Sequence, residues 1–170
     1  KVWLVCMGPK AKVQQVMMTV AQKVPFELVA LDAVSSGFTD AFEVSLYLAD
    51  AIAAIAGLDR GKLVLFGGWE SASRGAGVTM QMVGESFEIR EQFQGVDELT
   101  VQNDGSFRIL ERVEGGKHQV SVVRGAPIVI GWAPGNLADP PNNPQIGMIN
   151  MRTLMPSLQK AKSLKKWPAS

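Results

Sequence analysis

In this 170-residue chain, the residues best suited to chemistry surround a loop rich in glycine and serine at residues 69–79. The loop follows a short apolar run and contains Arg74, and Thr79 opens a helical pattern after it. Glycines let a ligand approach the backbone, and a helix N-terminus offers free N–H groups and a positive dipole. Arginine adds paired donors for an oxyanion, and threonine adds a hydroxyl. These features favour a phosphate-binding loop, although an ordinary Gly/Ser loop without a ligand has the same composition.

Other catalytic chemistries have little support in the sequence. His118 is the only histidine, and no neighbouring residue has the spacing of a Ser-His-Asp or His-metal site. Cys6 is the only cysteine, which excludes an intrachain disulfide and a CxxC motif. Redox chemistry would need a cofactor, and no GxGxxG motif follows a predicted strand. We therefore expect no catalytic or metal-binding residues, and any flavin should be held largely by another subunit.

Three apolar runs separated by helical patterns must position the loop. Residues 2–7, 26–31 and 62–66 have the continuous apolar character of strands buried on both faces of a parallel sheet. Thr39 or Asp40 can cap the helix that precedes the third run. This order predicts a doubly wound, mostly parallel α/β sheet, which binds ligands beyond the carboxyl ends of its strands. The candidate cofactor-binding residues at those ends are Val5, Met7, Gly8, Gly67, Gly68, Arg74, Gly75, Gly77, Val78 and Thr79. Trp69, in the same loop, could stack on an adenine.

The pattern changes after about residue 93 to short segments in which apolar and polar residues alternate. Hairpin signals separate these segments at Asn103-Asp104-Gly105 and at Glu114-Gly115-Gly116. We therefore predict an antiparallel β-meander over about residues 96–124. The apolar run at 127–132 is expected to return to the main sheet. Residues 1–132 would then form one α/β nucleotide-binding-type domain.

Residues 133–170 are predicted to be an extended linker and a C-terminal tail. No acidic residue follows Asp139, whereas five basic residues do, namely Arg152, Lys160, Lys162, Lys165 and Lys166. Such a tail fits docking to an acidic partner, and it equally fits a solvated terminal extension. The whole chain has a formal net charge of +1 and no apolar run near the ~20 residues that span a membrane. We expect neither nucleic-acid binding nor a transmembrane segment.

Five motifs follow one another along nearly the whole chain. They are a strand ending at Gly8-Pro9, a strand ending at Gly67-Gly68 with a helix opening Thr79-Met80-Gln81-Met82, the Glu114-Gly115-Gly116 turn, the run at 125–130 and the segment at 155–162. In this order the motifs resemble those of electron transfer flavoprotein β subunits. The resemblance implies a nucleotide-binding fold of the adenine nucleotide α-hydrolase type, located in the mitochondrial matrix or the bacterial cytoplasm.

The resemblance also implies a function and partners. Subunits of this family form a heterodimer with an α subunit, hold AMP, and share an interface with an FAD held mainly by the α subunit. They pass electrons from acyl-CoA-type dehydrogenases to a quinone reductase, so the chain would be an electron carrier rather than an enzyme. Met155 falls at the position of a leucine that enters a dehydrogenase pocket. The implied partner-docking residues are Arg152, Met155, Leu158, Lys160 and Lys162, which could instead pack on this protein or its partner.

The sequence departs from the family pattern at three places. The loop at 69–79 is about one residue longer and lacks the family's run of aspartates. The stretch at 136–148 replaces a shorter family segment, and the strand and helix that the family has before Val2 are not in the sequence. We therefore expect part of the AMP pocket to come from outside this chain. Two alternatives stay open: a non-catalytic structural subunit that kept the fold inside a larger assembly, and a nucleotide-binding sensor domain.

Overall fold

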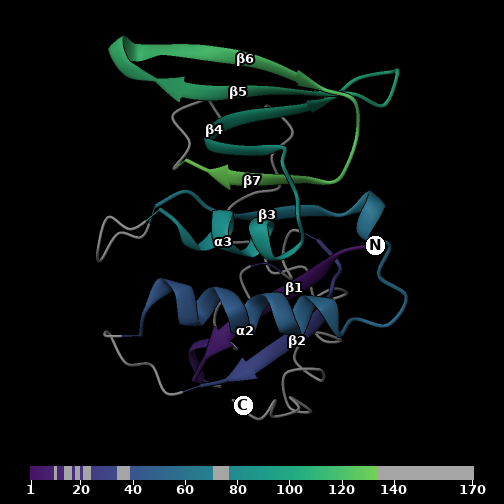
Figure 1. Ribbon diagram of the computed structural model, residues 1–170, viewed down its shortest axis with the longest axis vertical. Helices are drawn as coiled ribbons and strands as arrows, with labels where there is room; N and C mark the ends of the chain where they lie inside the picture. Colours follow the sequence, from purple (N-terminus) through teal and green to yellow (C-terminus); the bar gives the residue numbers. More distant parts are fainter. Residues whose placement is uncertain are drawn as a thin grey trace. The chain divides into compact units, whose positions relative to one another are not determined.

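The computed structural model describes residues 1–9, 11–13, 17, 20, 24–33, 39–70 and 77–133 (Figure 1). Within these residues the fold is mixed α/β, with a two-stranded parallel sheet and a five-stranded mixed sheet. The two sheets belong to two different compact units of the chain. The predicted α/β class is therefore confirmed, while the doubly wound arrangement stays a prediction.

The two-stranded sheet consists of β1 (Trp3–Gly8) and β2 (Glu27–Asp32), which run parallel. The register runs from Trp3 opposite Glu27 to Gly8 opposite Asp32, so the carboxyl ends of both strands lie side by side. Met17, a helical residue between the strands, is fully buried and packs with Phe26. Both strands were predicted from their apolar runs, and each lies one residue further along the chain than expected.

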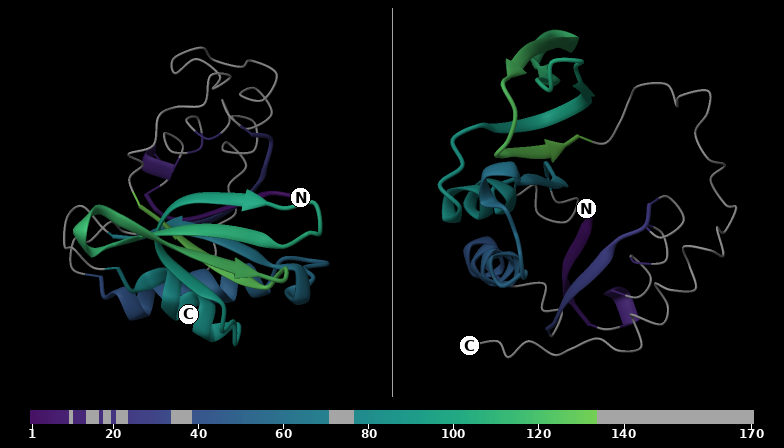
Figure 2. Two further views of the ribbon diagram at one scale, coloured as in Figure 1. Left: turned by 90° about the horizontal axis from the view of Figure 1, so that it is seen from above. Right: turned by 90° about the vertical axis from the view of Figure 1, so that its right-hand side faces the viewer.

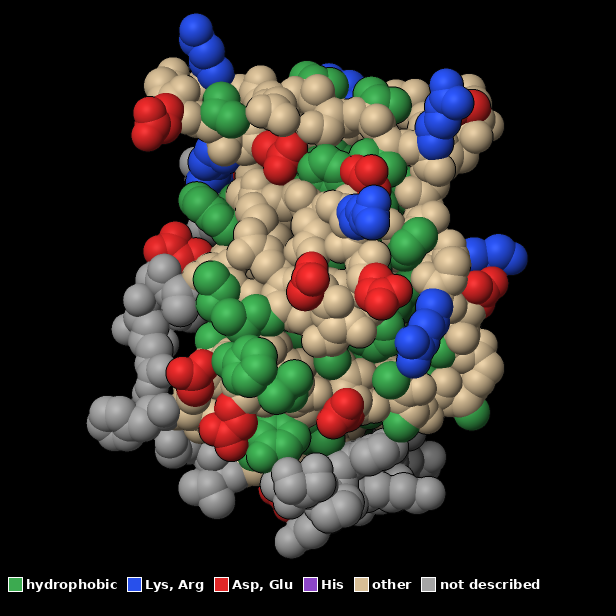
Figure 3. Space-filling view, viewed as in Figure 1, with side chains coloured by type: hydrophobic (Ala, Val, Ile, Leu, Met, Phe, Trp, Pro, Cys, Tyr) green, Lys and Arg blue, Asp and Glu red, His purple; other side chains and the backbone are tan. Residues whose placement is uncertain are grey.

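Helix α2 (Ala41–Ala53) begins where the sequence predicts it. The Asp40 carboxylate accepts a hydrogen bond from the Phe42 backbone N–H at 2.7 Å, which satisfies one of the free donors of the first turn. Phe42 and Leu46 are exposed on this helix, as are the acidic residues Glu43 and Asp50. In Figure 3 the surface over α2 accordingly combines hydrophobic and acidic side chains.

The five-stranded sheet has the order β3-β7-β4-β5-β6. Its strands are β3 (Val64–Gly68), β4 (Gln92–Val101), β5 (Phe107–Val113), β6 (Lys117–Val123) and β7 (Ile128–Trp132), with short 3-10 turns at Arg60–Lys62 and Glu114–Gly116. Strand β7 is parallel to both β3 and β4, whereas β4, β5 and β6 form antiparallel pairs. The predicted meander is confirmed, and the last strand pairs with β3, one of the three strands of the expected main sheet. Figure 2 shows the twist of β5 and β6 from two further directions.

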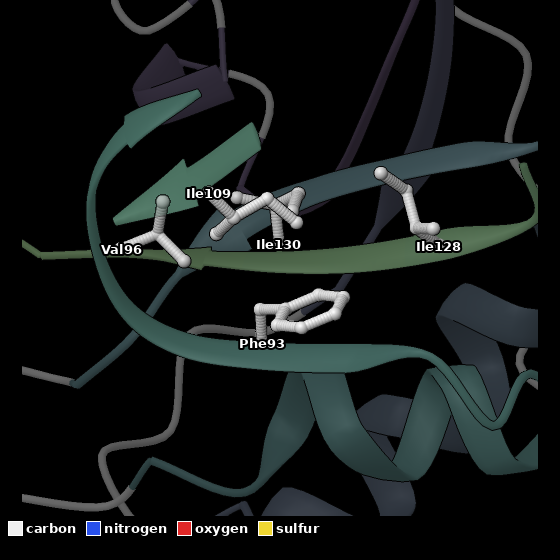
Figure 4. Close-up of a cluster of buried hydrophobic side chains, with 5 residues drawn as sticks. All are labelled: Phe93, Val96, Ile109, Ile128 and Ile130. Carbon is white, nitrogen blue, oxygen red and sulfur yellow. The ribbon is translucent and has the colours of Figure 1, made fainter. Parts of the chain in front are cut away.

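One cluster of apolar side chains forms the core of the five-stranded sheet. Phe93 and Val96 of β4, Ile109 of β5, and Ile128 and Ile130 of β7 pack together (Figure 4). Four of these five side chains have no exposed surface at all. Parallel and antiparallel strands therefore share one core, which joins the meander to the parallel part of the sheet.

Helix α3 (Thr79–Ser86) packs against the same sheet. A Cβ atom on Gly84 would lie 2.7 Å from Cγ2 of Val129, so the helix backbone approaches β7 closely at that point. Near the start of the helix, the Met80 side chain lies over Gly67 of β3. Because Gly67 lies near the end of β3 and Val129 near the start of β7, α3 runs opposite to the strands. Its N-terminus therefore lies at their carboxyl ends, as in other α/β units.

Candidate functional site

The candidate site lies at the carboxyl ends of β3 and β7. Gly67 and Gly131 are paired across the two strands, and Gln94 of β4 is the next partner of Gly131. The three residues form one row across the sheet, on the face that α3 covers. A Cβ on Gly131 would lie 2.8 Å from Cδ of Gln94, so the Gln94 amide rests directly on the glycine backbone. Only glycine at positions 67 and 131 leaves room for the side chains above them.

The two ends of the loop that follows β3 meet each other. The Trp69 N–H donates to the Trp132 carbonyl at 2.9 Å, which extends the pairing of β3 with β7 by one residue. Gly77 lies against the start of the loop, because a Cβ there would be 2.6 Å from the Trp69 carbonyl oxygen. Glycine is therefore required at position 77 by the close approach of two backbone segments.

The N-cap residue of α3 provides no side-chain cap. Val78 occupies the N-cap position and offers no acceptor, and its carbonyl accepts the first helical hydrogen bond from Met82 at 3.0 Å. Thr79 and Met80 follow in the first turn. The N–H groups of that turn and the positive end of the helix dipole can therefore bind an anion.

Trp69 has a packing role that the sequence did not predict. A Cβ on Gly95 would lie 3.6 Å from the indole of Trp69 and 3.8 Å from Cβ of Arg112, so both side chains border Gly95. Gly95 has a φ of 65° and lies where the register between β4 and β7 shifts. This local irregularity makes space for the indole against β4. The Trp69 indole thus packs against β4 of its own sheet.

A charged cluster next to Gly95 joins the three strands of the meander. Arg112 donates two hydrogen bonds to Asp97, from Nε at 3.0 Å and from Nη2 at 2.5 Å. Nε2 of His118 lies 2.8 Å from Oδ2 of the same carboxylate. The Asp97 side chain is only 2% exposed. The Arg112 guanidinium above all, and also His118, lower the pKa of the Asp97 carboxyl.

Replacing Asp97 with asparagine should destabilise the protein at pH 7, because Arg112 and His118 would lose their shared carboxylate. A lowered pKa in the folded state means that this contribution is present above the ordinary aspartate pKa of about 3.9. The contribution is lost as the pH falls through the lower folded value. Urea unfolding should therefore show a clear difference between wild type and Asp97→Asn at pH 7 that shrinks at about pH 3.

The matched control is Asp50→Asn, which changes an exposed aspartate on α2 and should stay within about 0.5 kcal/mol of wild type. If Asp97→Asn unfolds at the same urea concentration as wild type at pH 7, the cluster contributes nothing to stability.

The structure brings together five of the ten predicted cofactor-binding residues, namely Gly67, Gly68, Gly77, Val78 and Thr79, at the end of β3 and the start of α3. Val5, Met7 and Gly8 lie on β1, in the other unit. Arg74 and Gly75 are outside the described residues, as are all five predicted docking residues: Arg152, Met155, Leu158, Lys160 and Lys162.

Sequence reasoning missed two members of the row, Gly131 and Gln94. A glycine inside an apolar strand is itself a signal of close approach, so the pattern Ile-Val-Ile-Gly-Trp could have indicated Gly131. Gln94 gave no such signal. Its Oε1 and Nε2 are buried and have no hydrogen-bond partner among the described residues, and the same holds for Oε1 of Gln92. Buried amide atoms are rarely left unpaired, so the Gln94 amide is suited to meet a polar group of a ligand or a bound water.

The described parts of the chain lack a metal cluster and a membrane-spanning helix. No three His, Cys, Asp or Glu side chains gather there in a way that could hold a metal ion. No helix in those parts has the length and apolar character needed to cross a membrane.

Burial raises the pKa of the Cys6 thiol to about 11, so this group is protonated and unreactive at neutral pH.

No family model matches this chain, and no curated protein matches it.

Proposed function

We propose that this chain is a β-like subunit of an electron transfer flavoprotein, which binds AMP and pairs with an α-like subunit that holds FAD. The observation that carries the proposal is the glycine-lined end of β3 and β7 beside the start of α3, whose N-cap residue Val78 makes no side-chain cap. The order of motifs along the sequence supports the same assignment. The mitochondrial matrix or the bacterial cytoplasm would be the compartment.

The geometry suits a phosphate group at the start of α3. Backbone N–H groups of the first turn and the Thr79 hydroxyl are donors, and a phosphate brings only acceptors at neutral pH. Gly67 and Gly77 keep the surrounding backbone free of bulky side chains. The Gln94 amide lies on the same row, has no partner within the described parts of the chain, and supports a polar ligand rather than an apolar one.

The chain's own part in electron transfer is to bind and orient. The flavin supplies the redox chemistry, since ordinary side chains do not carry electron pairs. In this proposal the partner subunit holds most of the FAD, and the tail with Met155 and Arg152 docks acyl-CoA-type dehydrogenases. The AMP site fixes the end of β3 against α3 and so stabilises the subunit.

Native mass spectrometry and the absorbance spectrum of the complex purified from its source test this assignment. Stoichiometric AMP together with a flavin spectrum is the expected result. Co-purification with a large assembly, with neither ligand present, would instead identify a structural subunit. AMP without any flavin-bearing partner would identify a nucleotide-binding sensor domain.

Calorimetric titration of AMP tests the residues of the site. Thr79→Ala should weaken binding by about 1–2 kcal/mol, because a hydroxyl donor to a charged phosphate is lost. Thr100→Ala, on β4, is the control and should leave the affinity unchanged, since its hydroxyl already donates to Glu98 at 3.1 Å. Equal affinity in wild type and Thr79→Ala would remove Thr79 from the site.

A further inference from the structure

Strand β6 is an open edge of the five-stranded sheet. Within the described part of the chain it pairs with β5 alone, and it lies at the outer end of the strand order (Figure 1). An edge strand presents unpaired N–H and C=O groups that can bind another strand. The pairing of β6 with β5 runs without a register shift from Lys117 to Val123, so no bulge interrupts this edge.

The middle of β6 is apolar where edge strands are usually protected. Val120 is 53% exposed and Val122 is 61% exposed, and the two side chains point to the same face. Leu110 of β5 lies opposite Val120 on that face. Proteins commonly block an exposed edge with lysine, proline or a bulge near its centre. The sequence Lys-His-Gln-Val-Ser-Val-Val has a lysine only at its first position and contains no proline.

The ends of the edge are basic. Lys117 begins β6 and Arg124 follows it, and both are exposed. No acidic residue occurs in β6. Arg112 and His118 bind Asp97, and Arg108 pairs with Glu98. Of the other acidic neighbours, Glu111 accepts a hydrogen bond from the Ser121 hydroxyl at 3.1 Å, and Glu114 lies in the turn before Lys117. Two exposed valines therefore lie between two basic side chains that face solvent.

The charges decide which strand could occupy this edge. A second copy of β6, paired antiparallel about Val120, would place Lys117 opposite Val123 of the other copy, and neither strand has a carboxylate to pair with the basic ends. The tail of the same chain is also unsuitable, because only basic charges follow Asp139. We propose that β6 docks an extended segment of another protein that carries alternating β-branched residues between carboxylates. This segment would extend the sheet by one strand, with its apolar residues beside Val120 and Val122.

A fluorescent peptide tests the proposal on the full chain. The probe is fluorescein-labelled Glu-Val-Thr-Val-Thr-Val-Glu, and its counterpart has lysine in place of both glutamates. In anisotropy titrations at low salt, the acidic probe should bind at least about tenfold more tightly than the basic one. Val120→Lys should weaken binding of the acidic probe at least about tenfold, because it places a charge in the apolar centre of the edge.

Two variants make the test specific. Val101→Lys alters a valine that is 64% exposed at the end of β4, away from β6, and should leave binding unchanged. Lys117→Glu combined with Arg124→Glu should reverse the preference between the two probes. The proposal is overturned by no binding of the acidic probe, by equal binding to Val120→Lys, or by an unreversed preference. Self-association of the wild-type chain that Val120→Lys abolishes would also overturn it and identify a second copy as the occupant. The AMP titrations that test the proposed function probe the start of α3, so their result does not depend on whether β6 binds a peptide.

Discussion

Replacing Ile109 with alanine should lower the free energy of unfolding by about 2–5 kcal/mol, which is a large part of the stability of a small domain. Ile109 has no exposed surface and lies within the cluster formed by β4, β5 and β7. Three carbon atoms would be lost from a site bordered by Val96 and Ile130. Strands on either side hold these neighbours in place, so the space left by the isoleucine cannot close fully.

Equilibrium unfolding in urea, followed by tryptophan fluorescence, measures this effect. Val101→Ala is the control, because this valine lies in the same sheet but is 64% exposed, and its loss should cost at most about 0.5 kcal/mol. A change below about 1 kcal/mol for Ile109→Ala would contradict the assignment of Ile109 to a closely packed core.

Replacing Gly77 with alanine should destabilise the protein by about 1–3 kcal/mol and weaken AMP binding. The new Cβ would meet the Trp69 carbonyl oxygen at 2.6 Å, and the two backbone segments cannot separate without displacing their surroundings. The Trp69 N–H is bonded to Trp132, so the shift falls on the Gly77 side and moves the start of α3. Displaced N–H groups would no longer converge on a phosphate.

Gly68→Ala is a close control for this prediction. It changes a glycine at the other end of the same loop, where a Cβ would have no atom of the described residues within 4 Å. Thermal unfolding should show a loss for Gly77→Ala and little change for Gly68→Ala, and AMP titration compares Gly77→Ala with Thr100→Ala. Similar behaviour of the two variants would mean that the loop ends do not meet as described.

Local patterns in the sequence predicted most of the elements. The apolar runs of β1, β2 and β3, the Asp40 cap of α2 and the glycine turn before β6 each depend on residues that are close together in the chain. Periodicity and turn residues report such local preferences directly. The start of α3 at Thr79 was predicted for the same reason.

Features that depend on distant residues were not predictable. The run at 128–132 fits any buried strand, and its place between β3 and β4 depends on pairings with residues about 35 to 65 positions earlier. Asp97 falls at a register shift between β4 and β5, which brings it to Arg112 and His118. The burial of the Gln94 amide likewise follows from the glycine on the neighbouring strand.

The central position of β7 affects the order in which the sheet can be completed. The meander β4-β5-β6 pairs neighbouring segments and can form as soon as residue 123 is available. The contact between β3 and β4 passes entirely through β7, the last described strand to be synthesised. Until Trp132 has left the ribosome, β3 has no partner strand within this sheet. The row of Gly67, Gly131 and Gln94 beneath the candidate nucleotide site is then incomplete. Completion of the site is thus tied to the last step of sheet assembly, because pairings between distant segments close more slowly than local ones.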